Sequence, residues 1–203
     1  MEFELHAKLL DHVIFKNKKI KLKTQFTNVL SAYAIANDDG LLPEQKISMC
    51  LNRLVKHRWY IRLLPLEEKN ELLQLIFSEF VTNGAVKPAK QKSFDFFQDA
   101  KYIYSAFWQA YGINLFARHV KLHWYEFLAL FAGLPDNTRF MQIVEIRTRP
   151  MPKATKYNAE QRQQLARLKH EYRIQTTEKE RRQMLQEGLA NLAKTLEGMA
   201  RYG

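Results

Sequence analysis

Cysteine is nearly absent from this sequence, which excludes a framework of internal disulfides. The one cysteine, Cys50, falls on the apolar side of a helical pattern, so a small buried hydrophobe is favoured over a reactive thiol. The sequence also has no Cys-x-x-Cys pair, no glycine-rich phosphate loop and no Gly-x-Ser-x-Gly elbow. Enzymatic chemistry therefore has little support, and we expect no catalytic residue, no metal site and no cofactor.

Long apolar runs are absent as well. No stretch approaches the roughly 18 residues needed to cross a bilayer, and residues 1–5 have neither the basic start nor the apolar core of a signal peptide. We expect no membrane segment and a location in the cytoplasm of the cell that makes the protein. Core material is abundant, since 46% of the residues are apolar and 12% are aromatic.

Acidic residues are scarce relative to basic ones, with 21 Asp and Glu against 32 Lys and Arg and a formal net charge of +11. Residues 1–84 hold 12 basic and 10 acidic side chains, whereas residues 153–203 hold 11 and 6, so the excess lies in the C-terminal half. This balance favours an acidic partner or nucleic acid on electrostatic grounds, with plain solubility as the alternative.

The first 84 residues have the pattern of a hairpin followed by helices. Val13, Phe15, Ile20 and Leu22 alternate around a polar turn in which Asn17 tolerates a positive φ, which predicts a short β-hairpin. Apolar residues then recur at helical spacing from Phe26 to about residue 38, over 43–56 and over 66–81. We expect these elements to form one module, 1–84. The following segment, about 83–93, reads either as a linker or as an ordinary ordered loop.

Residues 93–150 are predicted to form a second helical module. One helical face is shared by Phe96, Ala100, Ile103 and Phe107. Asp95 and Asp99 fall in the first turn of this helix, where the macrodipole favours negative charge. This helix should stop at Tyr111 before a left-handed Gly112. A second helix should end at Gly133, and Asp136 or Asn137 should start a third. The side chains that define this motif are Ala100, Tyr102, Ile103, Phe107, Tyr111, Gly112, Trp124, Phe127, Gly133, Phe140 and Ile143.

Residues 153–203 are predicted to form an extended helical tail, after two prolines that break the preceding helix. Asn158 is a plausible N-cap for its first helix, and Thr176 or Thr177 for its last. The last helix has a narrow apolar seam that requires a partner, and docking on its own body, on another copy or on a client helix are all open. The seam, our predicted partner-binding site, comprises Leu185, Leu189, Leu192, Leu196 and Met199.

Two side-chain groups have alternative readings. His119, His123 and Glu126 could share a helical face as metal ligands, but solvated or capping histidines are favoured because the zinc-protease spacing is absent. The dense aromatic set around Trp108 and Trp124 could stack on bases, but its helical spacing favours core packing.

The segment from Phe94 to Pro152 resembles a family of small proteins from tailed phages and prophages of Gram-positive bacteria, encoded just upstream of the tape measure protein. The resemblance is carried by three stretches: Asp99-Ala100-x-Tyr102-Ile103-Tyr104-x-x-Phe107-x-x-x-Tyr111-Gly112, Leu122-His123-Trp124-x-x-Phe127, and Phe140-x-Gln142-Ile143. It implies a tail assembly chaperone that holds the tape measure protein in solution while the tail tube forms. The resemblance supplies no catalytic residue. It also implies that the protein is located in the cytoplasm of a bacterial host.

We therefore expect a mainly α-helical protein with two small helical modules, a short N-terminal hairpin and an extended C-terminal helical tail. The leading hypothesis is a non-enzymatic tail assembly chaperone whose partners are the tape measure protein and a companion tail assembly protein, with self-association as an alternative. The second hypothesis is a basic nucleic-acid-binding accessory protein, because of the net charge of +11. A third is a structural tail component retained in the virion.

Overall fold

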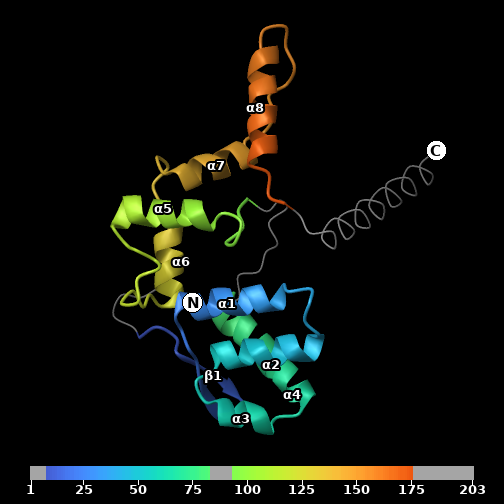
Figure 1. Ribbon diagram of the computed structural model, residues 1–203, viewed down its shortest axis with the longest axis vertical. Coiled ribbons are helices and arrows are strands. Elements are labelled where there is room, and N and C mark those ends of the chain that lie inside the picture. Colours follow the sequence, from blue (N-terminus) through green and yellow to red (C-terminus); the bar gives the residue numbers. More distant parts are fainter. Residues whose placement is uncertain (1–7, 83–92, 176–203) are drawn as a thin grey trace, which may run out of the picture. The chain divides into compact units, whose positions relative to one another are not determined.

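The computed structural model describes residues 8–82 and 93–175 and shows a mainly helical chain with one short N-terminal hairpin (Figure 1). The predicted fold class is confirmed. The chain divides into two compact units: unit 1 is Met1–Gln91 with Lys101–Gln142, and unit 2 is Lys92–Ala100 with Ile143–Gly203. This division differs from the predicted modules, because most of the 93–150 segment groups with the N-terminal elements instead of forming a module of its own.

The hairpin pairs β1, His12–Phe15, with β2, Lys18–Lys21, in antiparallel register. Its two turn residues, Lys16 and Asn17, have φ values of 47° and 58°. Two successive left-handed residues are the geometry of the hairpin turn whose twist matches the strands. The predicted hairpin and the positive φ at Asn17 are confirmed.

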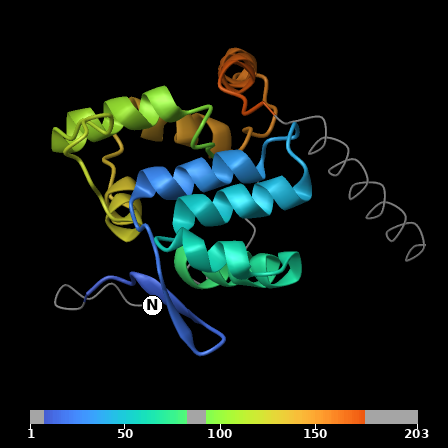
Figure 2. The same ribbon diagram turned by 60° about the horizontal axis from the view of Figure 1, so that its bottom comes forward.

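Unit 1 continues with α1 (Phe26–Ala36), α2 (Pro43–Leu54), α3 (Arg58–Leu63) and α4 (Leu66–Ile76), which runs into a π-helical turn, η1 (Phe77–Val81). Helices α1 and α2 lie side by side (Figure 2). Cys50 of α2 is fully buried, and its thiol donates to the Ala32 carbonyl at 3.4 Å, which confirms its reading as a core residue. Helix α3 was not predicted, because six residues are too few to show a helical period.

The motif supplies α5 (Ala100–Tyr111), α6 (Trp124–Ala132) and α7 (Arg139–Thr148). Helix α5 ends at Tyr111 as predicted, and Gly112 has a φ of 64°. The stretch before α6 pairs with the stretch before α1: the Phe26 amide donates to the Leu122 carbonyl at 3.1 Å, and the Trp124 amide to the Thr24 carbonyl at 2.7 Å. These bonds explain why α5 and α6 belong to the same unit as the hairpin.

Two predicted helix starts need correction. Residues 96–99 form a turn and α5 begins only at Ala100, so Ala100 is an exposed first residue and not part of a buried face. Helix α7 begins at Arg139, and the buried Thr138 hydroxyl accepts from the Met141 amide at 3.4 Å. Thr138 therefore caps the start of α7, the role that was predicted for Asp136 or Asn137. The helix begins later than predicted because a turn precedes it, in which the Thr138 amide donates to the Pro135 carbonyl.

Helix α8, Ala159–Glu171, follows Asn158 as predicted. The Asn158 side chain does not cap it, because its oxygen accepts from the Thr155 amide of the preceding loop at 2.9 Å. Other predictions lie outside the described residues: the segment 83–92, the caps at Thr176 or Thr177, and the entire seam from Leu185 to Met199. Within residues 8–82 and 93–175, none of the helices is both long and apolar enough to span a bilayer.

Candidate partner-binding surfaces

An aromatic stack in unit 1 joins helices α1, α5 and α6. The Phe127 ring lies 4.7 Å from that of Phe26 and 5.3 Å from that of Phe107, nearly parallel to both. The Trp124 ring lies 5.8 Å from Phe127 on the same helix. All four side chains are at most 5% exposed. Helices α1, α5 and α6 therefore share one core, which makes these motif aromatics structural rather than base-stacking groups.

The other motif residues occupy different environments. Gly133 is exposed, and a Cβ built on it would lie 3.3 Å from the Tyr111 hydroxyl, which donates to the Leu130 carbonyl at 2.8 Å. The glycine thus leaves room for a bond between α5 and α6. Of the remaining motif side chains, Ile103, Phe140 and Ile143 are buried, Tyr102 is half-buried, and Ala100 and Gly112 are exposed.

His123 is a capping residue at the start of α6. Its Nδ1 accepts from the Tyr125 amide at 3.1 Å, so its Nε2–H donates to the Leu10 carbonyl at 3.0 Å, and the Glu126 carboxylate accepts from the His123 amide at 2.7 Å. Burial lowers the pKa of His123, which favours the neutral ring that this arrangement needs. Both ring nitrogens are engaged, and the described residues hold no cluster of three or more metal-type ligands.

Two aromatic side chains of α6 donate hydrogen bonds to carbonyl groups at the end of η1. The Trp124 indole donates to the Val81 carbonyl at 3.0 Å, and the Tyr125 hydroxyl donates to the Glu79 carbonyl at 3.4 Å. Burial raises the pKa of Tyr125 to about 12. The carbonyls left over at a helix end need such donors when they are buried. Sequence reasoning could not find these bonds, because donor and acceptor are more than 40 residues apart.

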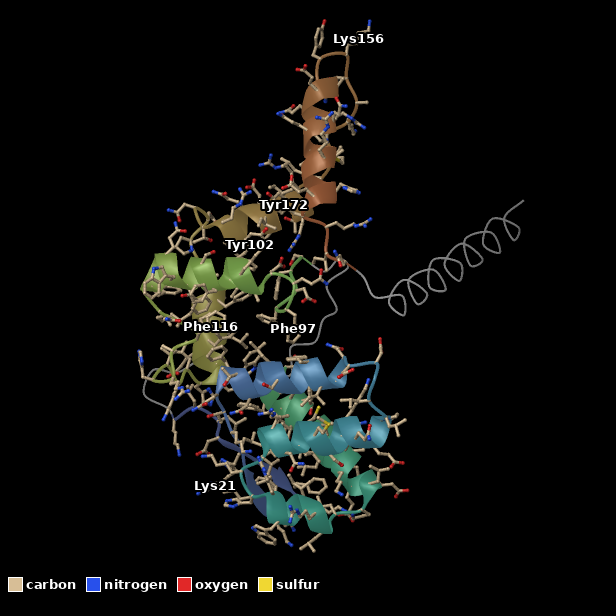
Figure 3. All side chains as sticks on the ribbon, in the orientation of Figure 1. Lys21, Phe97, Tyr102, Phe116, Lys156 and Tyr172 are labelled. Carbon is tan, nitrogen blue, oxygen red and sulfur yellow. The ribbon has the colours of Figure 1, made fainter. Side chains whose placement is uncertain are left out.

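A different group of aromatics faces outward from α5 and the loop after it. The Tyr104 and Phe116 rings lie 5.0 Å apart, and Phe116, labelled in Figure 3, is 79% exposed. Trp108, one turn along α5 from Tyr104, is 54% exposed. We call Tyr104, Trp108 and Phe116 the α5 aromatic face. We predicted that Trp108 packs in the core with the other aromatics, but it follows the fully buried Phe107 in α5 and so lies off the buried face.

One guanidinium group joins several segments of unit 2. Arg147 of α7 donates to both carboxylate oxygens of Asp99, at 2.6 and 2.8 Å, to the Ser93 carbonyl at 3.1 Å, and to the Tyr172 carbonyl at 2.6 Å. The Asp99 side chain is 2% exposed and that of Arg147 is 10% exposed. Asp99 was expected to serve a helix dipole from the first turn of its helix. Instead it precedes α5 and acts as a buried ion-pair partner.

The same unit fixes the last described residue. The Gln98 side chain donates to the Gln175 carbonyl and accepts from the Gln175 amide, both at 2.8 Å. Lys169 of α8 donates to the Arg147 carbonyl at 2.8 Å. The turn before α5, helix α7, the end of α8 and Gln175 are therefore joined by polar contacts.

Fold and surfaces define a small helical protein whose motif residues build much of the interior of the described chain and which leaves several large apolar side chains exposed. The family model described as Bacteriophage Gp15 protein matches residues 5–174. Because that match covers most of the chain, the protein belongs to this bacteriophage family. No curated protein and no solved structure matches the chain.

Proposed function

We propose that this protein is a tail assembly chaperone that binds the tape measure protein and keeps it soluble while the phage tail tube assembles. It acts without catalysis, in the cytoplasm of the bacterial host and together with a companion tail assembly protein. Membership of a bacteriophage family supports the phage setting. The narrower role is supported by the resemblance of the motif to chaperones encoded beside the tape measure gene.

The observation that carries the proposal is the α5 aromatic face. Phe116 is 79% exposed and packs against the Tyr104 ring, and Trp108, one helical turn from Tyr104, is 54% exposed. Aromatic residues dominate the binding energy of protein interfaces. A long helical client presents apolar side chains that such rings can cover. We place the first client contact at Trp108 and Phe116, and a second at the leucine seam, which the sequence alone supports.

Co-expression with the cognate tape measure protein tests the proposal. The soluble fraction of the client should rise in the presence of this chain, and the double variant Trp108→Ser with Phe116→Ser should lose most of that gain. Tyr157→Ser is the matched control, because Tyr157 is 97% exposed and belongs to unit 2, whereas the aromatic face belongs to unit 1. Leu189→Glu with Leu192→Glu tests the seam separately.

The outcomes separate the alternatives. A client that is equally soluble without this chain rejects the chaperone role. A client that depends on the chain but tolerates the Trp108 and Phe116 changes moves the contact elsewhere, to the seam if the leucine variant fails. Mass spectrometry of purified particles decides against a structural tail component if the chain is missing from them, as we expect of a chaperone.

A further inference from the structure

The outer face of the β-hairpin carries lysine side chains at alternating positions along β2. Val13, Phe15 and Ile20 are buried, so alternation along the strands places Lys19 and Lys21 on the opposite, exposed side. Lys21 is labelled on the hairpin in Figure 3.

A third stretch of chain extends this surface. Leu22 forms an antiparallel bridge with Val55, and both side chains are fully buried. The Lys56 amide donates to the Lys21 carbonyl at 3.0 Å. Lys21 and Lys56 are therefore opposite each other, and because their neighbours point inward, both side chains point outward. Directly opposed like charges destabilise a strand pair, so the fold carries an electrostatic cost at this point.

The connection from α2 to α3 adds further positive charge. The Lys23 ammonium donates to the Asn52 carbonyl at 2.8 Å, and its pKa is lowered first by burial and then by the nearby Arg58 and Arg53. The bond to Asn52 places the Lys23 ammonium beside the backbone next to Arg53 of α2, and Arg58 begins α3 two residues after Lys56. We define the basic face as Lys19, Lys21, Lys23, Arg53, Lys56 and Arg58.

Neighbouring acidic groups are engaged elsewhere. Asp11 pairs with Lys8 and His12 at 2.9 Å, and Glu68 pairs with Lys16 at 2.9 Å. Among residues 8–82 and 93–175, no carboxylate forms an ion pair with any of the six cations. Residues 1–84 are nearly balanced in charge, with 12 basic and 10 acidic residues, so the basic face arises from segregation of charge and not from excess.

We propose that the basic face binds single-stranded nucleic acid through its phosphates. Such a strand carries a negative charge at every nucleotide, which suits a row of point-charge ammonium groups better than a peptide with scattered carboxylates. Each nucleotide also brings a base, and Trp59, which follows Arg58 of the basic face in α3, has an indole that is 65% exposed. Exposed aromatic rings beside basic side chains form the stacking platforms of single-strand binders.

Fluorescence anisotropy of a labelled oligothymidylate with the full chain tests this proposal. The affinity should fall linearly with salt on a logarithmic plot, with a slope of about −0.7 per phosphate neutralised, or about −4 for six contacts. Lys21→Glu with Lys56→Glu should weaken binding at least tenfold at low salt, and Lys21→Gln with Lys56→Gln should lower the steepness of the slope by about 1.4. Trp59→Ala should weaken binding without changing the slope, because stacking releases no counterions.

The matched control is Lys153→Glu with Lys156→Glu, which makes the same change of charge at two exposed lysines of unit 2 (Figure 3). It should bind within twofold of the wild type. An equal loss in the control would reduce the effect to net charge and overturn the proposal. Equal affinity for polyglutamate would also overturn the proposal, because it would indicate an acidic protein partner. The absence of oligonucleotide binding at low salt would overturn it as well. Unchanged circular dichroism of each variant shows that the fold is retained.

Discussion

Replacing Arg147 by methionine removes the guanidinium group that joins three segments of unit 2 while keeping a long side chain in its place. The Asp99 carboxylate, 2% exposed, would lose both of its charge-assisted bonds and keep the one from the Asp95 amide at 2.9 Å. The Ser93 and Tyr172 carbonyls would lose their donor as well. Removing one partner of a buried ion pair costs about 3–5 kcal/mol, because the other charge stays buried and uncompensated.

Hydrogen exchange measured by mass spectrometry is the suitable assay for this change, because Trp59, Trp108 and Trp124 all belong to unit 1 and tryptophan fluorescence would not report on unit 2. A loss of about 3 kcal/mol should speed exchange in α8 roughly 100-fold. Arg147→Lys keeps the positive charge but loses the planar, bidentate guanidinium donors. The exchange rate of α8 in this variant should lie between those of the wild type and Arg147→Met.

A double-mutant cycle supplies the refutation. Arg147→Met combined with Asp99→Leu should destabilise unit 2 by clearly less than the sum of the two single changes, because no buried charge is left alone. Additive effects, or protection in α8 that is unaltered in Arg147→Met, would show that the guanidinium is peripheral to the stability of the unit.

Three further predictions concern unit 1. Gly112→Ala should lower stability by about 1 kcal/mol in a thermal melt, because its φ of 64° strains any residue with a Cβ although nothing lies within 4 Å of that position. Burial places the pKa of His123 below the ordinary histidine value of about 6.5, so the unfolded chain binds the proton first as the pH falls. Stability should therefore be lost below about pH 6.5, and His123→Asn should flatten that profile. Lys21→Glu should raise stability by about 0.2–1 kcal/mol through a cross-strand pair with Lys56, which a denaturation midpoint would reveal.

Local patterns were sufficient for most of the fold. Alternation of buried and exposed residues predicted the hairpin, and the glycine after Tyr111 predicted the end of α5. Helix α3 was missed because six residues hardly exceed one and a half turns. The late start of α5 was missed because Phe96 continues the apolar period although the chain there forms a turn.

Long-range contacts account for what the sequence could not predict about the candidate sites. Asp99 resembles a helix-start carboxylate until its partner, 48 residues away, is known. The basic face was hidden because a count over residues 1–84 averages the lysines of the hairpin with the glutamates of α4. The α5 aromatic face was hidden for a similar reason, since the pattern places Trp108 near buried rings but does not show that its own ring points outward.

The dependence of unit 2 on a guanidinium group has a consequence for how the protein responds to denaturants. Dissolved guanidinium ions have the same planar donors as Arg147 and can compete for the Asp99 carboxylate and for the Ser93 and Tyr172 carbonyls, whereas urea carries no charge. Guanidinium chloride should therefore unfold unit 2 at concentrations that leave the aromatic core of unit 1 folded. In urea, the unfolding midpoints of the two units should lie closer together.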